Sequence, residues 1–200
     1  MLLDRLKKYS IVLASQSPRR KELLSGLGIV FEVNWKDTNE SPSMDFTSCQ
    51  LVEYLAWQKA QAVANQYDLR KTIIIGGDTV VCLDNNIMGK PTDKSDAIHI
   101  LQQLSGKKHL VISGLCILHK GLVLCNHDIT EVYFKPLTNE EITYYVDSYQ
   151  PFDKAGSYGI QEWIGYQAIE RINGSFYNVM GLPTHLLWNM LEEITNSSQQ

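Results

Sequence analysis

Two patterns of hydrophobic positions alternate along the chain. Short continuous apolar runs, as at 11–14 and 73–75, are typical of buried strands. Apolar residues spaced three or four apart over 51–65 and 97–104 instead predict helices with one buried face. Because strand-like and helix-like segments follow one another, the sequence predicts an α/β fold.

Capping residues mark the ends of several predicted elements. Ser17 and Pro18 are a preferred N-cap and a preferred first helical residue, and a glycine at position 28 is a typical helix stop. They predict a helix over 18–27. Thr138 and Glu141 form a capping box, which predicts a helix through residue 146.

The remaining segments are predicted from turn residues and β-rich runs. Lys120-Gly121 lies between two long β runs and predicts a hairpin. The polar stretch 34–48 predicts a long loop. Further along the chain we expect a polar glycine-rich loop over 153–165, strands near 168–172 and 177–180, a helix from residue 183, and a disordered tail over 196–200.

Composition and length place the chain among globular proteins of one domain or of two small lobes that share a sheet. It has 200 residues, 44% hydrophobic and 20% charged. A net charge of −4 and an isoelectric point near 5.7 argue against nonspecific nucleic-acid binding. No apolar stretch has the length of a membrane span, and residues 1–10 lack a signal-peptide core. We therefore expect a cytoplasmic protein with no nucleic-acid or membrane partner.

The four cysteines do not form a recognisable motif. They lie at positions 49, 82, 116 and 125, and no two of them make a CxxC pair. This scatter predicts reduced thiols of a cytosolic protein and disfavours a zinc site.

The first candidate site follows the run at 11–14. Ser15 lies in a turn of small residues, and Arg19 and Arg20 lie in the first turn of the predicted helix. Two guanidinium groups beside the positive end of a helix dipole favour a bound anion. The segment therefore indicates a phosphate pocket, with a pair of solvated arginines as the alternative.

A second candidate is the carboxylate of Asp78, which follows Gly76-Gly77 in an apolar strand. Glycines there allow a ligand to approach the backbone closely. A carboxylate on a buried strand must be paired, bound to a metal or catalytic. A structural aspartate bonded to backbone groups is the alternative reading.

Other polar residues carry a weaker signal. Lys90 lies between a glycine and a proline, which suits either a phosphate contact or an exposed turn. Gln161 lies in the polar glycine-rich loop that begins at Asp153, where its amide could read a base edge, although a plain connector also fits. Glu40 in the polar loop and Lys59 in a helix would each ordinarily be solvated. The motifs of P-loop kinases, zincins and serine hydrolases are absent.

Seven ordered motifs together give the chain a family resemblance. They are LASQSPRRKELL, LAWQKA, GGDTVV, GKP, LSGKKH, FDKAGSYGIQ and INGSFYNVMGLP. From about residue 11 to about residue 191 the chain resembles the Maf family of nucleoside triphosphate pyrophosphatases. The resemblance implies one Maf-like domain over 1–200, with an elongated two-lobed α/β fold, a twisted mixed sheet and a deep central cleft, similar to the inosine triphosphatases.

The resemblance also implies an activity. Maf-like enzymes cleave between the α and β phosphates with a divalent cation such as Mg, Mn or Co, and they release a nucleoside monophosphate and pyrophosphate. The ending YGIQ resembles the dTTP/UTP branch, so modified pyrimidine nucleotides are further candidate substrates. A homodimer is implied. The alternative is a non-catalytic nucleotide-binding regulator of cell division and septum formation.

The resemblance assigns a role to each candidate residue. Asp78 is the implied proton acceptor, and Glu40 assists the metal or the water, so these two are the implied metal ligands. The implied catalytic lysines are Lys59 and Lys90. The implied substrate-binding residues are Ser15, Arg19, Arg20, Thr79, Lys154 and Gln161. Gly77 stands where the family usually has alanine, which adds backbone freedom before Asp78.

Overall fold

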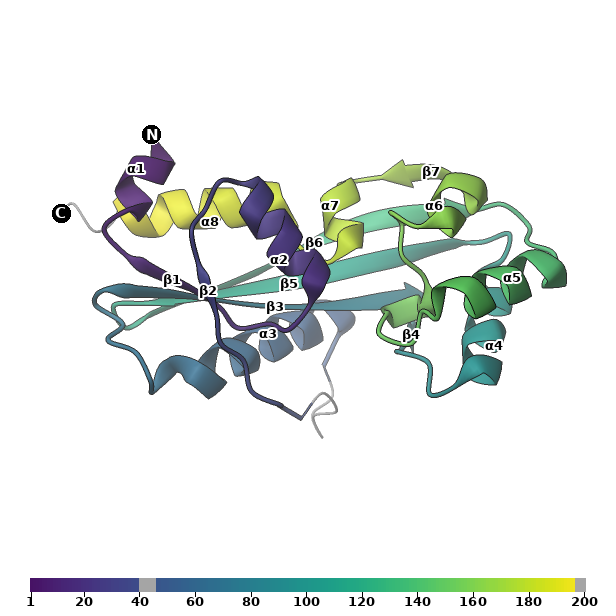
Figure 1. Cartoon of the computed structure of the whole chain (residues 1–200), viewed down its shortest axis with the longest axis horizontal. Coiled ribbons are helices and arrows are strands. Elements are labelled where there is room, and N and C mark those ends of the chain that lie inside the picture. The colour runs from purple at the N-terminus through teal and green to yellow at the C-terminus, as the bar shows by residue number, and fades with distance from the viewer. Residues whose placement is uncertain (40–45, 197–200) are drawn as a thin grey trace. The chain divides into compact units, whose positions relative to one another are not determined.

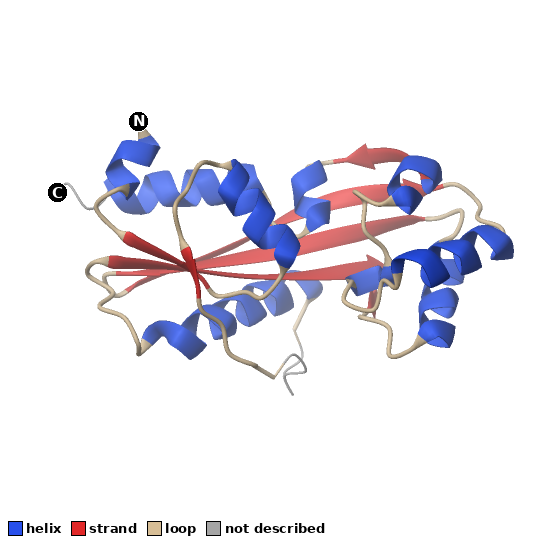
Figure 2. Ribbon diagram, viewed as in Figure 1, coloured by secondary structure: helices blue, strands red, loops and turns tan. Residues whose placement is uncertain are grey.

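The computed structural model describes residues 1–39 and 46–196, and it confirms a mixed α/β fold (Figures 1 and 2). The described strands form a mixed, twisted sheet in the order β2-β1-β3-β5-β6-β7, with β4 paired to β3. The strands are β1 Ser10–Leu13, β2 Glu32–Val33, β3 Thr72–Leu83, β4 Asn86–Met88, β5 Lys108–His119, β6 Leu122–Phe134 and β7 Ile169–Asn173. The α-helices are α1 Leu2–Leu6, α2 Pro18–Gly26, α3 Ser48–Ala64, α4 Lys94–Leu104, α5 Asn139–Tyr149, α6 Trp163–Ala168, α7 Phe176–Met180 and α8 Thr184–Asn196.

The chain divides into two compact units. Unit 1 contains Met1–Asp78, Ser113–Asp128 and Gly181–Gln200. Unit 2 contains Thr79–Ile112 and Ile129–Met180. The divisions fall inside β3, β5 and β6, so each of these strands contributes residues to both units.

Unit 1 is a layered structure around the parallel strands β1 and β3. Helix α3 covers one face of these strands, and α2 and α8 cover the other (Figure 1). The face toward α3 carries an apolar cluster, with Val12, Ile74 and Leu118 packed against Ala56 and Ala60. Because successive strand residues point to opposite faces, residues 74, 76 and 78 of β3 point toward α3.

Two glycines allow α3 to lie directly on the sheet. A Cβ atom added to Gly76 would lie 2.1 Å from the carbonyl oxygen of Ala56, and one added to Gly114 would lie 2.3 Å from that of Val52. These distances are far below van der Waals contact. The helix backbone therefore contacts the strand backbone at positions where only glycine fits.

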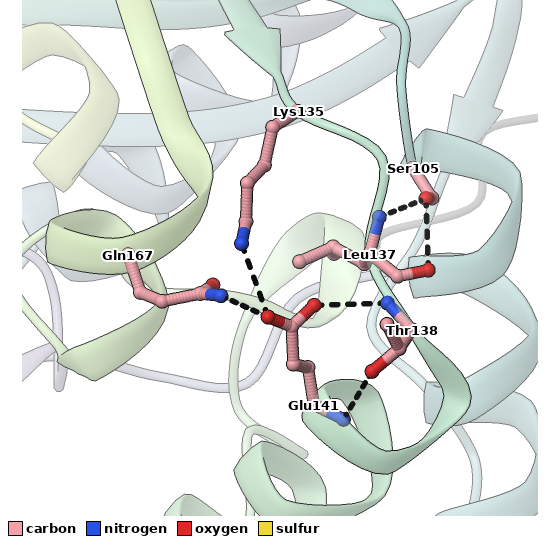
Figure 3. A network of polar contacts seen from close by, with 6 residues as sticks. All are labelled: Ser105, Lys135, Leu137, Thr138, Glu141 and Gln167. Atoms are coloured by element: carbon pink, nitrogen blue, oxygen red, sulfur yellow. Dashed lines mark hydrogen bonds and ion pairs between the residues drawn. The ribbon is translucent and has the colours of Figure 1, made fainter.

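Unit 2 contains the antiparallel pairs β3–β4 and β6–β7, together with helices α4, α5, α6 and α7. The predicted capping box begins α5, with Thr138 and Glu141 each accepting from the other's backbone N–H group (Figure 3). Glu141 also binds Lys135 at 3.0 Å and accepts from the Gln167 amide. These contacts hold the pKa of Glu141 below its ordinary value, chiefly through the Thr138 backbone bond.

Two sequence predictions were wrong. Residues 176–180 form helix α7 rather than a strand, because Ser175 accepts from the backbone N–H of Asn178 and so caps a helical turn. The buried Asn178 amide then donates to Val111 O at 3.1 Å and Thr130 Oγ1 at 2.9 Å. Helix α8 extends to Asn196, and the rest of the predicted tail, residues 197–200, lies outside the described residues. Helix α6 begins inside the predicted loop.

Candidate active site

The start of α2 has the geometry that the sequence predicts. Ser17 is the N-cap and accepts from the backbone N–H of Arg20, and Pro18 is the first helical residue. The buried Ser15 hydroxyl accepts from the backbone N–H of Ser17 at 3.2 Å. This turn fixes the direction in which both arginines leave the helix, and Arg19 remains half-buried beside it.

The buried side chain of Arg20 binds protein acceptors. Its Nε donates to the carbonyl oxygen of Gly181 at 2.8 Å, and its Nη1 donates to Ser15 Oγ at 3.3 Å. These bonds offset part of the repulsion between a guanidinium and the helix dipole. Arg20 therefore needs a bound anion at the start of α2 less than the sequence indicates.

Asp78 and Lys59 form an ion pair on the α3 face of β3. Lys59 Nζ lies 2.5 Å from Asp78 Oδ1, and the two side chains are only 16% and 11% exposed. The neighbouring Gly77 faces the opposite side, where an added Cβ would lie 3.3 Å from Arg20 Nε. The structure thus gathers Ser15, Arg20, Lys59 and Asp78 around one point of β3, with Arg20 and Asp78 on opposite faces.

In unit 2, the turn that holds Lys90 is tied to the glycine-rich loop. The backbone N–H of Gly156 donates to the carbonyl oxygen of Gly89 at 3.1 Å. Gly156 has a φ of +69°, and a Cβ there would lie 2.8 Å from Val81 Cγ2. Glycine is therefore required for the loop to lie against β3 beyond Thr79. Lys90 itself is exposed, and Thr79 is half-buried.

Lys154 is held inside that loop by two carboxylates. Its Nζ lies 2.7 Å from Asp153 Oδ1 and 3.2 Å from Glu162 Oε1, and its side chain is 9% exposed. Glu162 also accepts from the hydroxyl of Tyr145, which in turn accepts from the backbone N–H of Gly159 at 3.0 Å. Glu162 and Tyr145 therefore position the loop that ends in Gln161, and sequence reasoning missed both. No motif signals them, because they are brought together only by the packing of α5.

Gln161 presents an acceptor with no partner among the described residues. Its Oε1 atom is buried and receives no hydrogen bond from them. A buried acceptor without a donor is unfavourable unless a ligand or water supplies one. A donor on a bound molecule that reached this amide would satisfy the acceptor.

The buried His109 contacts Tyr158 of the same loop. His109 Nε2 and the Tyr158 hydroxyl lie 2.8 Å apart, and both rings contact Phe134 edge to face. Burial lowers the pKa of His109 from 6.5 to about 4, and it raises the pKa of Tyr158 well above its ordinary value. The histidine is therefore neutral at pH 7.

This burial predicts an acid-sensitive stability. Between pH 6.5 and about 4 the unfolded chain binds a proton at His109 and the folded chain does not, so unfolding becomes more favourable as the pH falls. We expect His109 to account for a loss of about 3 kcal/mol across that window. Urea unfolding at several pH values measures it. His109→Gln should flatten the pH dependence, with His99→Gln as a control at an exposed histidine. Equal slopes in wild type and His109→Gln would contradict the assignment.

The remaining predicted site residue, Glu40, lies outside the described residues. Within 1–39 and 46–196 there is no group of three His, Cys, Asp or Glu side chains arranged to hold a metal ion. In the same part of the chain no helix is long and apolar enough to cross a membrane.

The matches to known proteins cover almost the whole chain. Residues 10–194 match the family model described as Maf-like protein. The dTTP/UTP pyrophosphatase of Porphyromonas gingivalis W83 is 50% identical over 98% of this chain and 100% of its own. The enzymes of the same name from Phocaeicola vulgatus and Bacteroides thetaiotaomicron are 47% and 44% identical, each over 96% of this chain and 100% of their own.

Among solved structures, the Staphylococcus aureus Ham1 protein is similar with a TM-score of 0.43 and 13% identity, covering 62% of this chain and 71% of its own. That likeness is too weak to carry an argument about fold or function.

Proposed function

Because the chain belongs to the Maf family, we propose that it is a nucleoside triphosphate pyrophosphatase that hydrolyses dTTP and UTP to the monophosphate and pyrophosphate. Relatives bearing the name dTTP/UTP pyrophosphatase match almost the whole chain. The observation that carries the proposal is the buried Asp78 carboxylate on β3, paired with Lys59 of α3. It occupies the position that the family resemblance marks as the proton acceptor.

The proposed chemistry requires a base and positive charge. Lys59 fixes the orientation of Asp78 through Oδ1, and the other carboxylate oxygen can accept a proton from the attacking water. Phosphoryl transfer is otherwise mainly a matter of positioning and charge neutralisation. The cationic side chains of Arg19 and Lys90 would supply that charge. Arg20, which donates to Gly181 O and Ser15 Oγ on the other face of β3, would help to position the start of α2.

The residues fit a metal held partly by the substrate. Magnesium is commonly bound by one or two carboxylates together with substrate phosphates. Asp78 provides one described carboxylate, and Glu40 would be the second. A divalent cation bound there would neutralise phosphate charge and lower the pKa of a bound water. The resemblance further implies a cytoplasmic homodimer, which stays a prediction.

Base selection is assigned to Gln161, with Thr79 and Arg19. Thymine and uracil present an N3–H donor between two carbonyl acceptors, whereas cytosine presents an acceptor at N3. The unpartnered Gln161 Oε1 matches the N3–H donor and mismatches cytosine. A mismatched buried amide is left unpaired, so the site should discriminate against dCTP.

Gln161→Ala should reduce the preference for dTTP and UTP over dCTP. We expect kcat/KM for dTTP and UTP to fall by about 5- to 150-fold, the range that corresponds to about 1–3 kcal/mol. The value for dCTP should fall less. Steady-state kinetics on the three nucleotides measure the ratio. An equal loss on all three would assign Gln161 a structural role and place the base reader elsewhere.

A nucleotide panel tests the proposed function itself. The purified chain is incubated with each canonical and several modified nucleoside triphosphates and a divalent cation, and pyrophosphate is measured. We expect dTTP and UTP to be turned over fastest. Nucleotide binding without turnover of any member would instead support the non-catalytic regulator.

A further inference from the structure

Two cysteines face each other across the hairpin of unit 1, far along the chain from the proposed catalytic residues. The hairpin joins β5 and β6 through Lys120 and Gly121, whose φ angles are +49° and +78°. Positive φ at both central residues defines a two-residue type I′ turn. Such a turn makes His119 and Leu122 the first facing pair, so Cys116 and Cys125 face each other three pairs further on.

The register gives this pair the backbone geometry of a disulfide. The pair that closes a two-residue hairpin is hydrogen-bonded, and the types then alternate, so the cysteines form a non-hydrogen-bonded pair. Cα atoms in such pairs are about 4.5 Å apart, within the range of about 4.4–6.8 Å found for disulfides. The side chains agree, because the two Sγ atoms face each other at 2.7 Å and no disulfide joins them.

The two thiols are exposed to solvent to different degrees. Cys116 is fully buried in the core beneath α3, whereas Cys125 is partly exposed at the edge of that core. The hydrogen bond between the two thiols lowers the pKa of Cys125, and burial and the Glu53 carboxylate oppose that effect. The same hydrogen bond, together with burial, raises the pKa of Cys116. Cys125 is therefore the thiol that ionises first.

We propose that Cys116 and Cys125 are an oxidative modification site, at which hydrogen peroxide converts the facing thiols into a reversible cross-strand disulfide. The Cys125 thiolate attacks one peroxide oxygen, giving a sulfenic acid and releasing hydroxide. The Cys116 sulfur then attacks the Cys125 sulfur. The new S–S bond forms as the S–O bond breaks, and the Cys116 proton leaves with the oxygen as water.

Several features of the hairpin favour this reaction over others. A small oxidant suits a thiol that is only partly exposed, and the second thiol is already in contact. No group of three metal-ligating side chains occurs in the part of the chain that the structure describes, so a metal centre at these sulfurs has no support. The site depends on no catalytic residue, so its test is independent of the proposed hydrolysis.

Mass spectrometry of the intact, full-length chain tests the proposal. After treatment with hydrogen peroxide we expect the mass to fall by two hydrogens, with one peptide pair linked through Cys116 and Cys125. Dithiothreitol should restore the original mass. Cys49→Ser is the matched control and should leave the cross-link unchanged.

Single variants separate the roles of the two thiols. In Cys116→Ser, the sulfenic acid at Cys125 has no partner and should be trapped by dimedone. In Cys125→Ser, which alters only the partly exposed position, the buried Cys116 should stay unmodified. A gain of oxygen at Cys125 of the unmutated chain without a cross-link would overturn the proposal. A cross-link that involves Cys49 or Cys82 would overturn it as well.

Discussion

Replacing Asp78 with asparagine should lower kcat for dTTP by at least about a hundredfold, the usual scale for losing a general base. The amide keeps the shape of the side chain but cannot accept the proton of water. The asparagine also removes the negative charge that pairs with Lys59, whose Nζ lies 2.5 Å from Asp78 Oδ1. Steady-state kinetics with saturating dTTP and divalent cation measure the loss.

The lost ion pair adds a stability cost that the sequence alone does not predict. Lys59 is only 16% exposed in its side chain, so loss of its ion pair with Asp78 should lower the thermal midpoint. Kinetics are therefore compared well below the midpoint of the variant. Asp84→Asn, the same change in an exposed turn, is the control and should retain activity. Retention of most turnover by Asp78→Asn would remove Asp78 from the role of base.

Replacing Gly76 with alanine should destabilise the fold by about 3 kcal/mol, at the upper end of overpacking costs. The added Cβ would lie 2.1 Å from the carbonyl oxygen of Ala56 and 3.0 Å from Ala60 Cβ. Neither the helix backbone nor the strand can move away without separating α3 from the sheet. Because α3 carries Lys59, activity should fall as well. Urea unfolding at pH 7 measures the change in free energy.

The adjacent glycine provides the matched control. A Cβ on Gly77 would approach only the Arg20 side chain, at 3.3 Å from Nε, which a small shift relieves. Gly77→Ala should therefore change stability by less than about 1 kcal/mol. Similar losses at both positions would show that the close contact of α3 with β3 is not what position 76 requires.

Local signals allowed much of the fold to be predicted from the sequence. Ser17 and Pro18 gave the start of α2 to the residue, because capping is a local interaction. Thr138 and Glu141 did the same for α5. The hairpin at Lys120-Gly121 was also found, since its turn residues fix the register.

Elements that depend on distant partners could not be predicted. The sequence predicted a strand over 177–180, yet these residues lie in α7, which the Asn178 amide holds against groups of β5 and β6. In the sequence, the two glycines of β3 indicated a close approach of a ligand to the backbone. In the structure β3 is continuous, and the glycines instead admit α3 on one face and Arg20 on the other.

In the candidate site, too, some residues could be predicted from the sequence and some of their contacts could not. Family motifs pointed to Asp78 and Lys59, and the structure brings them together. Neither motifs nor spacing indicated that Arg20 binds Gly181 O or that Lys154 is enclosed by Asp153 and Glu162. Such contacts are formed by side chains far apart in sequence, so they become visible only once the chain is folded.

Identification of the products of dTTP hydrolysis tests the central claim most directly. The purified chain is incubated with dTTP and a divalent cation, and the phosphorus products are followed by nuclear magnetic resonance from the earliest turnovers. We predict dTMP and pyrophosphate in equal amounts, as attack between the α and β phosphates requires. Release of dTDP with orthophosphate would contradict it.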